Sequence, residues 1–563
     1  MSNRHTYSYE GPLPLGSVVA HHCGAAGLVT AKDAHWQLVG REIHKSAYIE
    51  GLAHESLGHE GLARENLGHE GLENEALGHE GLGQYILEVY EVQNEESISK
   101  ERLLRATIRG EISSSGRTHM GGQLLRLLRT AQGLAPVGEW GTMVGVRPTK
   151  LFHKLWDQAV QDERSSVLPI RAASLAPMEE AQRAGQQNFS EAHAVMTDLA
   201  QKASEALREL HEVSESKLSL LRQIGTLQRP YVEPKEHMKS HISVYAGIPF
   251  CQTRCTYCSF PYGLIQDYER IPEFVRAFRA DAVHLEHIVK RFNLTVDSLY
   301  MGGGTPTSLD DEDFAHVLAA LQPLHQEHRE FTVEAGRPDS VTKSKLDTMK
   351  RCGVTRISIN PQSMQDSVLK AIARGHTAAD IRQLYKVVKQ STDFIVNMDF
   401  IAGLPHQTLA YMEENLDYVC QARPENVTIH TLALKRGSPL YEGHGLEAMP
   451  EEAVVKEMVN LSRARLEAAG YVPYYVYRQQ YMRGQLENIG YTLPGYECEY
   501  NIRIMEERQS ILSIGPGSSS KWISGTDYRQ KKQHVPKDVS VYIDTLHTLL
   551  QKRETLSNTH WEG

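Results

Sequence analysis

The chain has 563 residues with a formal net charge of −10, and 40% of its residues are hydrophobic. This length predicts two or three domains, and the acidic balance excludes a general attraction to nucleic acid. No apolar stretch reaches membrane-spanning length and seven cysteines are too few for a disulfide scaffold, so we expect a cytoplasmic protein without membrane insertion.

Residues 1–160 predict a small α+β domain. Strands are expected at 36–39, 86–92 and 103–108, and helices at 123–132 and 150–160. Residues 50–83 repeat a ten-residue unit that carries His59, His69 and His79. The period matches no common solenoid, and two glycines in each unit weaken a helix. We interpret the repeat as a solvated insertion, with metal binding by the histidines as the alternative.

Residues 161–235 predict a helical connector that ends at the run Gln228-Arg-Pro-Tyr-Val-Glu-Pro234. From 236 to 440 strands and helices then alternate, which predicts βα units and a parallel sheet. Strands are expected at 242–246, 298–302, 330–335, 356–359, 394–401 and 426–434, and helices at 272–292, 310–324, 342–352, 378–390 and 409–422. Six such units form a partial barrel, whose chemistry belongs at the carboxyl ends of the strands. Residues 441–550 predict an α/β extension, and 551–563 a frayed tail.

Three cysteines, Cys251, Cys255 and Cys258, follow the first of these strands within one short loop. Thiolates are the preferred ligands of iron–sulfur clusters, and three of them can hold three corners of a four-iron cube. The fourth iron would remain open to a substrate or cofactor, as the open position of a catalytic zinc does. A structural zinc site or chance clustering are the alternatives. The other cysteines are interpreted as incidental thiols: Cys23, Cys352, Cys420 and Cys498.

This cysteine spacing, with an aromatic residue before the last cysteine, resembles that of the radical S-adenosylmethionine (SAM) superfamily. The runs Tyr245-Ala-Gly-Ile-Pro-Phe-Cys251 and Met301-Gly-Gly-Gly-Thr-Pro-Thr307 resemble its oxygen-independent coproporphyrinogen III oxidase branch. The run from Trp140 to Lys154 is similar to the amino-terminal half of the HemZ-type coproporphyrinogen dehydrogenases. The resemblance extends from about residue 140 to about residue 525.

The resemblance implies a radical SAM partial (β/α)6 barrel with an N-terminal α+β domain and a C-terminal α/β extension, a [4Fe-4S] cluster on the three cysteines, and bound SAM. It also implies two sets of SAM contacts. The cluster-bound SAM would be lined by Tyr245, Gly303, Glu334 and Ala433. The inner pocket, where the best-known members hold a second SAM, would be lined by Tyr257, Gly304, Thr305, Gln362, Arg374 and Asp399. Arg374 is also the candidate for orienting a substrate carboxylate. Taken singly, a glycine run can be a tight turn, and a carboxylate at a strand end can cap the next helix.

The chain departs from the family at Gly247, where the well-known bacterial oxidases carry a histidine four residues before the first cysteine. This difference puts a proton-donating or substrate-positioning role in doubt. The run Ile511 to Lys521 resembles the family's carboxy-terminal glycine motif, or it is an ordinary strand and loop. Four residues could line a pocket for a flat aromatic substrate or could instead pack in the core: Tyr475, Tyr477, Arg478 and Tyr481.

The implied activity is oxidative decarboxylation of two propionates of coproporphyrinogen III to vinyl groups, which gives protoporphyrinogen IX in haem biosynthesis. The implied partners are the tetrapyrrole substrate and an electron donor such as flavodoxin or ferredoxin, with no nucleic acid, and the chain is expected to be a monomer. One alternative is another tetrapyrrole-acting radical SAM enzyme, either a methylase or a haem ring-opening enzyme. The other alternative is a non-catalytic haem carrier.

Overall fold

The computed structural model describes the backbone of five strands in the first part of the chain and most of the rest. The described residues are 6–10, 29–30, 36–43, 83–92, 102–112, 138–143, 147–166, 186–232, 239–259, 263–435, 437–443, 446–479, 482, 484, 486–525 and 528–562. The chain divides into two compact units, Met1–Val144 with Leu210–Glu212, and Gly145–Glu209 with Val213–Gly563. None of the helices in the described part is long and apolar enough to cross a bilayer.

The first unit contains a five-stranded sheet in the order β2-β1-β3-β4-β5. Its strands are β1 (Thr6–Glu10), β2 (Val29–Thr30), β3 (Trp36–Ile43), β4 (Gly83–Val92) and β5 (Arg102–Ile112). β3, β4 and β5 are antiparallel to one another, and they confirm and extend the three predicted strands. The repeat before Gly83 and the helix predicted at 123–132 lie outside the described residues.

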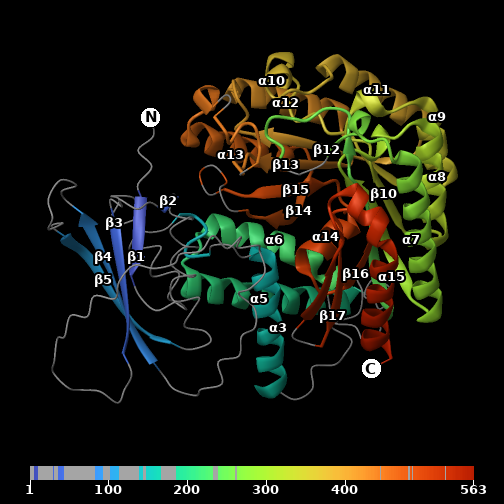
Figure 1. The fold of residues 1–563 in the computed structure, drawn as a ribbon. Helices are drawn as coiled ribbons and strands as arrows, with labels where there is room; N and C mark the ends of the chain where they lie inside the picture. Colours follow the sequence, from blue (N-terminus) through green and yellow to red (C-terminus); the bar gives the residue numbers. More distant parts are fainter. Residues whose placement is uncertain are drawn as a thin grey trace, which may run out of the picture. The chain divides into compact units, whose positions relative to one another are not determined.

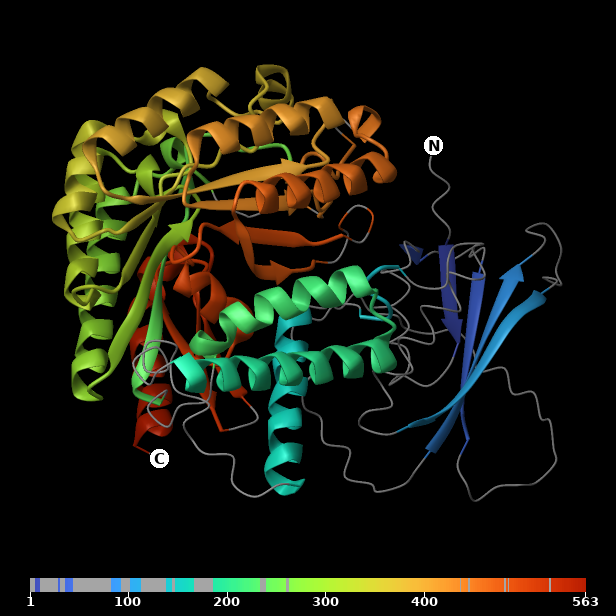
Figure 2. The same cartoon turned by 180° about the vertical axis from the view of Figure 1, so that it is seen from behind.

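The second unit contains the predicted partial barrel, in which six adjacent strands are parallel. They are β6 (His241–Ile248), β9 (Thr295–Gly303), β10 (Glu330–Glu334), β11 (Arg356–Ser358), β12 (Ile395–Ala402) and β13 (Asn426–Thr431). Helices cover the outer face of this curved sheet, as Figures 1 and 2 show. They are α7 (Ile271–Arg291), α8 (Asp311–Leu321), α9 (Lys343–Arg351), α11 (Ala378–Ser391) and α12 (Leu409–Ala422). A short helix that was not predicted, α10 (Asp366–Ala371), follows β11.

Side chains that follow the strands start four of these helices by capping their first free amide groups. The carboxylate of Asp310 accepts from the backbone of Asp313, and the hydroxyl of Thr342 accepts from Lys345. The remaining caps are Thr377, which forms a reciprocal capping box with Asp380, and Thr408. These four caps lie in the loops at the carboxyl ends of the strands, where the site is found.

Further strands extend both edges of the barrel into one eleven-stranded sheet. β16 (Ser510–Ile514) pairs in parallel with β6, and β17 (Ser519–Ser524) and β18 (Arg529–His534) follow it. At the other edge, β15 (Asn488–Thr492) pairs antiparallel with β13, and β14 (Val472–Tyr477) lies outside it. The glycine motif from Ile511 thus begins as a strand beside the first strand of the barrel.

Three helices differ from the sequence predictions. α3 (Pro148–Ser166) belongs to the second unit, whereas the prediction placed it in the N-terminal domain. α6 (Glu215–Val232) continues through Pro230, so the run predicted to break the helix begins inside it. The prediction of a frayed tail at residues 551–563 was wrong. α15 (Val539–Trp561) packs against α7 and is held by a buried ion pair.

That ion pair joins Arg553 of α15 to Asp281 of α7 at 2.7 Å, and both side chains are 1% exposed. The hydroxyl of Tyr542 and the amide of Gly515 also donate to Asp281, at 2.8 and 3.1 Å. Removing one partner of a buried pair leaves an uncompensated charge. We therefore expect Arg553→Met to lower the free energy of unfolding by about 3–5 kcal/mol in urea titrations.

The matched control for this prediction is Lys202→Met, which removes an exposed pair with Asp198 on α5 (Gln186–His211). An exposed pair on a helix surface contributes about 0.3–0.5 kcal/mol. Equal losses in the two variants would show that the Asp281–Arg553 pair does not anchor α15.

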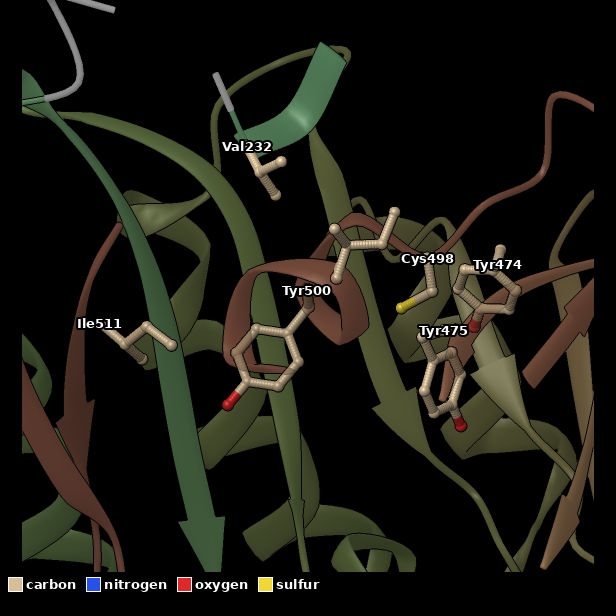
Figure 3. Packing of buried hydrophobic residues seen from close by; sticks show 7 residues of the cluster. Val232, Tyr474, Tyr475, Cys498, Tyr500 and Ile511 are labelled. Carbon is tan, nitrogen blue, oxygen red and sulfur yellow. The ribbon is translucent and has the colours of Figure 1, made fainter. Parts of the chain in front are cut away.

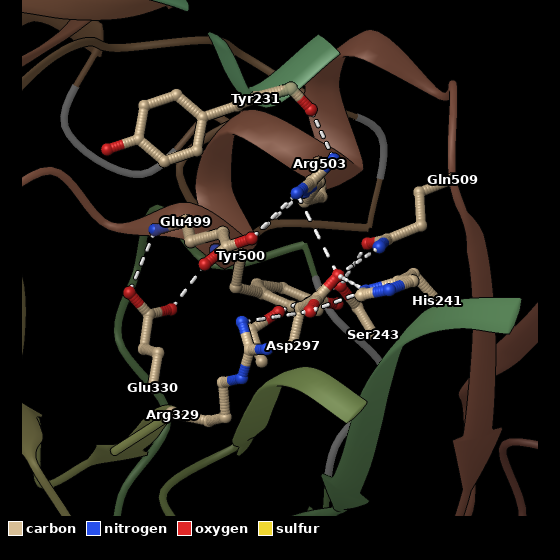
Figure 4. A network of polar contacts seen from close by, with 11 residues as sticks. Tyr231, His241, Ser243, Asp297, Arg329, Glu330, Glu499, Tyr500, Arg503 and Gln509 are labelled. Carbon is tan, nitrogen blue, oxygen red and sulfur yellow. Dashed lines mark hydrogen bonds and ion pairs between the residues drawn. The ribbon is translucent and has the colours of Figure 1, made fainter. Parts of the chain in front are cut away.

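The inner face of the sheet is covered by α14 (Glu499–Glu506), whose Tyr500 packs with Val232, Tyr474, Tyr475 and Ile511 (Figure 3). The helix is anchored at the amino ends of the strands. The carboxylate of Glu330 accepts from the backbone amides of Glu499 and Tyr500 at 2.8 and 3.0 Å. Figure 4 shows this contact beside the network of Asp297 with His241, Arg329, Arg503 and Gln509. This anchoring of α14 places Tyr500 next to the site described below.

Candidate functional site

The three cysteines lie on the loop after β6, at the carboxyl ends of the parallel strands. The short strand β7 (Phe250–Cys251) carries the first cysteine, and the amide of Cys258 donates to the carbonyl of Cys255 at 3.1 Å. The amide of Thr256 donates to the carbonyl of Ile372 after α10, and the carbonyl of Thr256 accepts from Leu440 after β13. The loop is thus held by two other loops of the same end of the barrel.

The glycine run at the end of β9 packs directly on this cysteine loop. The amides of Gly304 and Thr305 donate to the carbonyls of Ile248 and Phe250, at 2.8 and 2.6 Å. A Cβ atom on Gly303 would lie 2.8 Å from the Ile248 oxygen, and one on Gly304 would lie 2.8 Å from the Phe250 carbonyl carbon. Side chains are therefore excluded here by the approach of two backbones. The hydroxyl of Thr305 also lies 3.7 Å from the sulfur of Cys251.

Two arginines approach the cysteine loop from neighbouring strand ends. The guanidinium of Arg337 pairs with Asp339 at 2.9 Å and donates to the hydroxyl of Thr253 at 2.5 Å. Arg374 places Nη1 3.5 Å from the sulfur of Cys255 and donates from Nη2 to the carbonyl of Asn360 at 2.8 Å. The sequence prediction placed Arg374 in the inner pocket, and the structure places its charge against a predicted cluster ligand.

Glu334, at the end of β10, forms the second part of the site. The hydroxyl of Tyr300 donates to its carboxylate at 2.7 Å. Burial raises the pKa of Glu334 to about 7, although the hydrogen bond from Tyr300 opposes that shift. The rings of Tyr300, Tyr245 and Tyr500 form a cluster in which each contacts the other two, with centroids 6.2, 4.5 and 6.1 Å apart. Tyr245 and Glu334, both predicted SAM contacts, are therefore connected through one aromatic cluster.

Asp399, His430 and Tyr477 form the third part, on β12, β13 and β14. Oδ2 of Asp399 lies 3.7 Å from Nε2 of His430, whose Nδ1 lies 3.2 Å from the hydroxyl of Tyr477. Burial opposes ionisation of Asp399, but the hydrogen bonds and charge of its neighbours, His430 first, lower its pKa below the ordinary value. The side chain of Tyr477 stacks on Tyr475 at 6.3 Å. Tyr475 is a buried core residue, whereas Tyr477 lies at the site; Tyr481 lies outside the described residues.

Gln362 and Ala433 lie on the loops that follow β11 and β13. Gln362 adopts a left-handed backbone (φ 67°), and its amide donates to the carbonyl of Asp399 at 2.9 Å, while Ala433 bridges to Met482. Within the described residues, several buried polar atoms near the cysteine loop have no hydrogen-bond partner: Oε1 of Gln362, Oδ1 of Asn360, Oγ1 of Thr256 and Nε of Arg374. Buried polar groups are normally satisfied, so these atoms fit a site that receives a polar ligand.

The presence of glycine at position 247, where the sequence analysis expected a histidine, has a structural explanation. A Cβ atom on Gly247 would lie 2.8 Å from the carbonyl oxygen of Pro516, and Gly515 has a left-handed backbone (φ +81°) that packs on the Gly247 carbonyl. The glycine motif after β16 thus occupies the space into which a side chain at 247 would extend. An imidazole does not fit at 247 without displacing this loop.

Sequence reasoning located the thiols and strand ends but missed Tyr300, His430, Arg337 and Asn360. The last two follow strand ends directly, a position that could have marked them; Tyr300 and His430 lie inside apolar strands and gave no such signal. Among the described residues, no three His, Cys, Asp or Glu side chains form a group that could hold one metal ion.

Comparison with known proteins agrees with this architecture. Residues 245–419 match the model of the radical SAM superfamily. The chain is 34% identical over 422 residues to an oxygen-independent coproporphyrinogen-III oxidase-like protein, HemZ, of Bacillus subtilis, covering 74% of this chain and 76% of the relative. It is 27% identical over 289 residues to the heme chaperone HemW of the same organism, covering 50% of this chain and 72% of that protein. The solved structure of the Escherichia coli coproporphyrinogen III oxidase HemN aligns with a TM-score of 0.45 at 18% identity, covering 57% of this chain and 72% of that chain. The length and identity of the first match establish that the chain belongs to the oxygen-independent coproporphyrinogen-III oxidase-like family of radical SAM proteins.

Proposed function

We propose that this protein is a coproporphyrinogen III dehydrogenase that decarboxylates two propionates of its substrate to vinyl groups. The observation that carries the proposal is the convergence of the cysteine loop, the glycine run and Glu334 at one end of the barrel, in a chain similar over three quarters of its length to a HemZ protein. Membership of the family implies a [4Fe-4S] cluster and SAM. When bound, they supply an adenosyl radical that removes a hydrogen atom from a propionate β-carbon.

The chain's own residues would bind and orient these groups. The loop that carries Cys251, Cys255 and Cys258 would hold the cluster. The carboxylate of Glu334, which is ionised above its pKa of about 7, would accept hydrogen bonds from the ribose or ammonium group of SAM. The remaining residues that would contact SAM are Tyr245, Tyr257, Gly303, Gly304, Thr305, Gln362, Asp399 and Ala433. Tyr477 and His430 would face the tetrapyrrole. An electron donor such as flavodoxin or ferredoxin would reduce the cluster from outside.

The similarity to heme chaperones supports a second candidate function, a non-catalytic haem carrier. The deciding experiment is anaerobic incubation of the reconstituted protein with coproporphyrinogen III, SAM and a reductant, with products read by mass. We expect stepwise loss of two CO2 units together with 5′-deoxyadenosine. Stable binding of haem with no decarboxylation would support the carrier, and SAM cleavage without decarboxylation would indicate another substrate.

The titration of Glu334 predicts how SAM binding depends on pH. If the ionised carboxylate binds SAM, affinity should rise as pH increases through about 7, by about tenfold between pH 6 and pH 8. Equilibrium dialysis of the cluster-loaded protein would measure this. Glu334→Gln should remove the pH step. Tyr300→Phe should move it to higher pH, because the Tyr300 hydroxyl stabilises the ionised form. A step that persists in Glu334→Gln would assign the titration to another group.

A further inference from the structure

We infer that Arg374 raises the reduction potential of the cluster by donating a hydrogen bond to the sulfur of Cys255. The inference rests on the proposed function only in requiring a cluster on the cysteine loop. It gives Arg374 a role different from the one predicted from the sequence, where it would bind the inner SAM or a substrate propionate. The contact that carries it is the 3.5 Å approach of Nη1 to the Cys255 sulfur.

The backbone after α10 aims this side chain at the thiol. Ala373 adopts a left-handed conformation (φ 54°), and the amide of Arg374 donates to the carbonyl of Leu369 at 2.9 Å, so the chain turns back sharply. In the same turn, the carbonyl of Ile372 accepts from the amide of Thr256, next to Cys255. One turn therefore holds both the backbone of the cysteine loop and the arginine. The left-handed residue and the bond from the Arg374 amide form a common type of helix C-terminal cap, which ends α10 at this point.

The guanidinium group of Arg374 is also held through its second terminal nitrogen, Nη2. Nη2 donates to the carbonyl of Asn360 at 2.8 Å and lies 3.5 Å from that of Gly336. With Nη2 held by two backbone oxygens, Nη1 has little freedom to leave the sulfur, because the guanidinium is planar.

No carboxylate of the described residues lies at ion-pair distance from Arg374. The acid whose charge acts on it, Asp339, is already paired with Arg337 at 2.9 Å. The guanidinium group of arginine stays protonated in proteins, so Arg374 carries its charge at the cysteine loop. Reduction adds one negative charge to a cluster. A fixed positive donor on a ligand sulfur stabilises the reduced form more than the oxidised form, which raises the potential.

The test is a redox titration of the cluster-loaded protein, without SAM or tetrapyrrole, followed by the paramagnetic signal of the reduced cluster. At a fixed potential, Arg374→Gln should lower the ratio of reduced to oxidised cluster at least about tenfold, a shift of about 59 mV to more negative potential for one electron. Arg374→Lys keeps a charge but lacks the planar fork, so it should fall between wild type and Arg374→Gln.

The control is Arg254→Gln, which removes a positive charge adjacent to Cys255 in sequence. Arg254 is exposed and donates to the carbonyl of Gly437 at 2.6 Å, away from the thiols. This variant should change the ratio by less than about threefold. Equal shifts in Arg254→Gln and Arg374→Gln, or no shift in either, would overturn the inference. If Arg374→Gln fails to retain the cluster, an unshifted Arg374→Lys would overturn it. A wild-type protein that takes up no cluster would instead refute the proposed function.

Discussion

Replacing Cys251, Cys255 and Cys258 together with alanine should abolish cluster assembly and leave the barrel folded. The wild-type chain reconstituted without oxygen should carry about four irons and four sulfides, and the variant none. Burial raises the pKa of the Cys251 thiol to about 11, so its thiolate forms only where a positively charged metal lies beside it. Reductant-dependent cleavage of SAM should then fall at least about a thousandfold, as measured by release of 5′-deoxyadenosine.

The matched control is Cys352→Ala, which removes a thiol at the end of α9, outside the cysteine loop. It should retain the full content of iron and sulfide. The far-ultraviolet circular dichroism of both variants should match wild type, since the loop is held by backbone hydrogen bonds from Ile372 and Leu440 that do not involve the thiols. Zinc as the only metal in anaerobically prepared wild-type protein would contradict the cluster.

The barrel was predictable because its signals are local. Four of the helices that cover the sheet begin at a polar cap such as Thr342 or Thr408, and the parallel strands are short, mostly apolar runs, so the alternation is visible in the sequence itself. The C-terminal helix was not predictable in this way. α15 is stabilised by Arg553, which pairs with Asp281 across 272 positions of the sequence. No local pattern in residues 551–561 reports such a partner.

The site was predictable to the same extent. The structure places the three cysteines on the loop after β6, where the sequence marks a turn, while their role as cluster ligands and the SAM contacts stay predictions. The direction in which a long side chain extends depends on distant partners. Arg374 points to Cys255 because the carbonyls of Asn360 and Gly336 hold its fork, and neither contact has a signature in the sequence. The same holds for position 247. The sequence shows only a glycine in place of the expected histidine, and the packing of Gly515 and Pro516 against Gly247 is visible only in the structure.

The packing of the glycine motif gives the last prediction, which concerns Gly515→Ala. Gly515 has a left-handed backbone (φ +81°), and a Cβ atom there would clash with the carbonyl of Gly247 on β6. Gly470 has a similar backbone (φ +87°) with nothing within 4 Å of such an atom. Gly470→Ala should therefore lose only the left-handed strain, about 1–2 kcal/mol in urea unfolding. Gly515→Ala should lose that and at least about 2 kcal/mol more, because the opposing group is backbone and cannot rotate away.

The difference in unfolding free energy between these two variants measures the contribution of the contact between the loop after β16 and the first strand of the barrel. That contact positions the end of β6, from which the chain passes directly into Ile248, Phe250 and the cysteine loop. Gly515→Ala should consequently weaken SAM binding at least about tenfold in equilibrium dialysis, while Gly470→Ala leaves it within a factor of two. Equal affinities in the two variants would show that the cysteine loop keeps its position without the glycine motif. Weaker binding in Gly515→Ala alone would mean that the strand beyond the barrel supports the site through backbone contact, in the space into which a side chain at position 247 would extend.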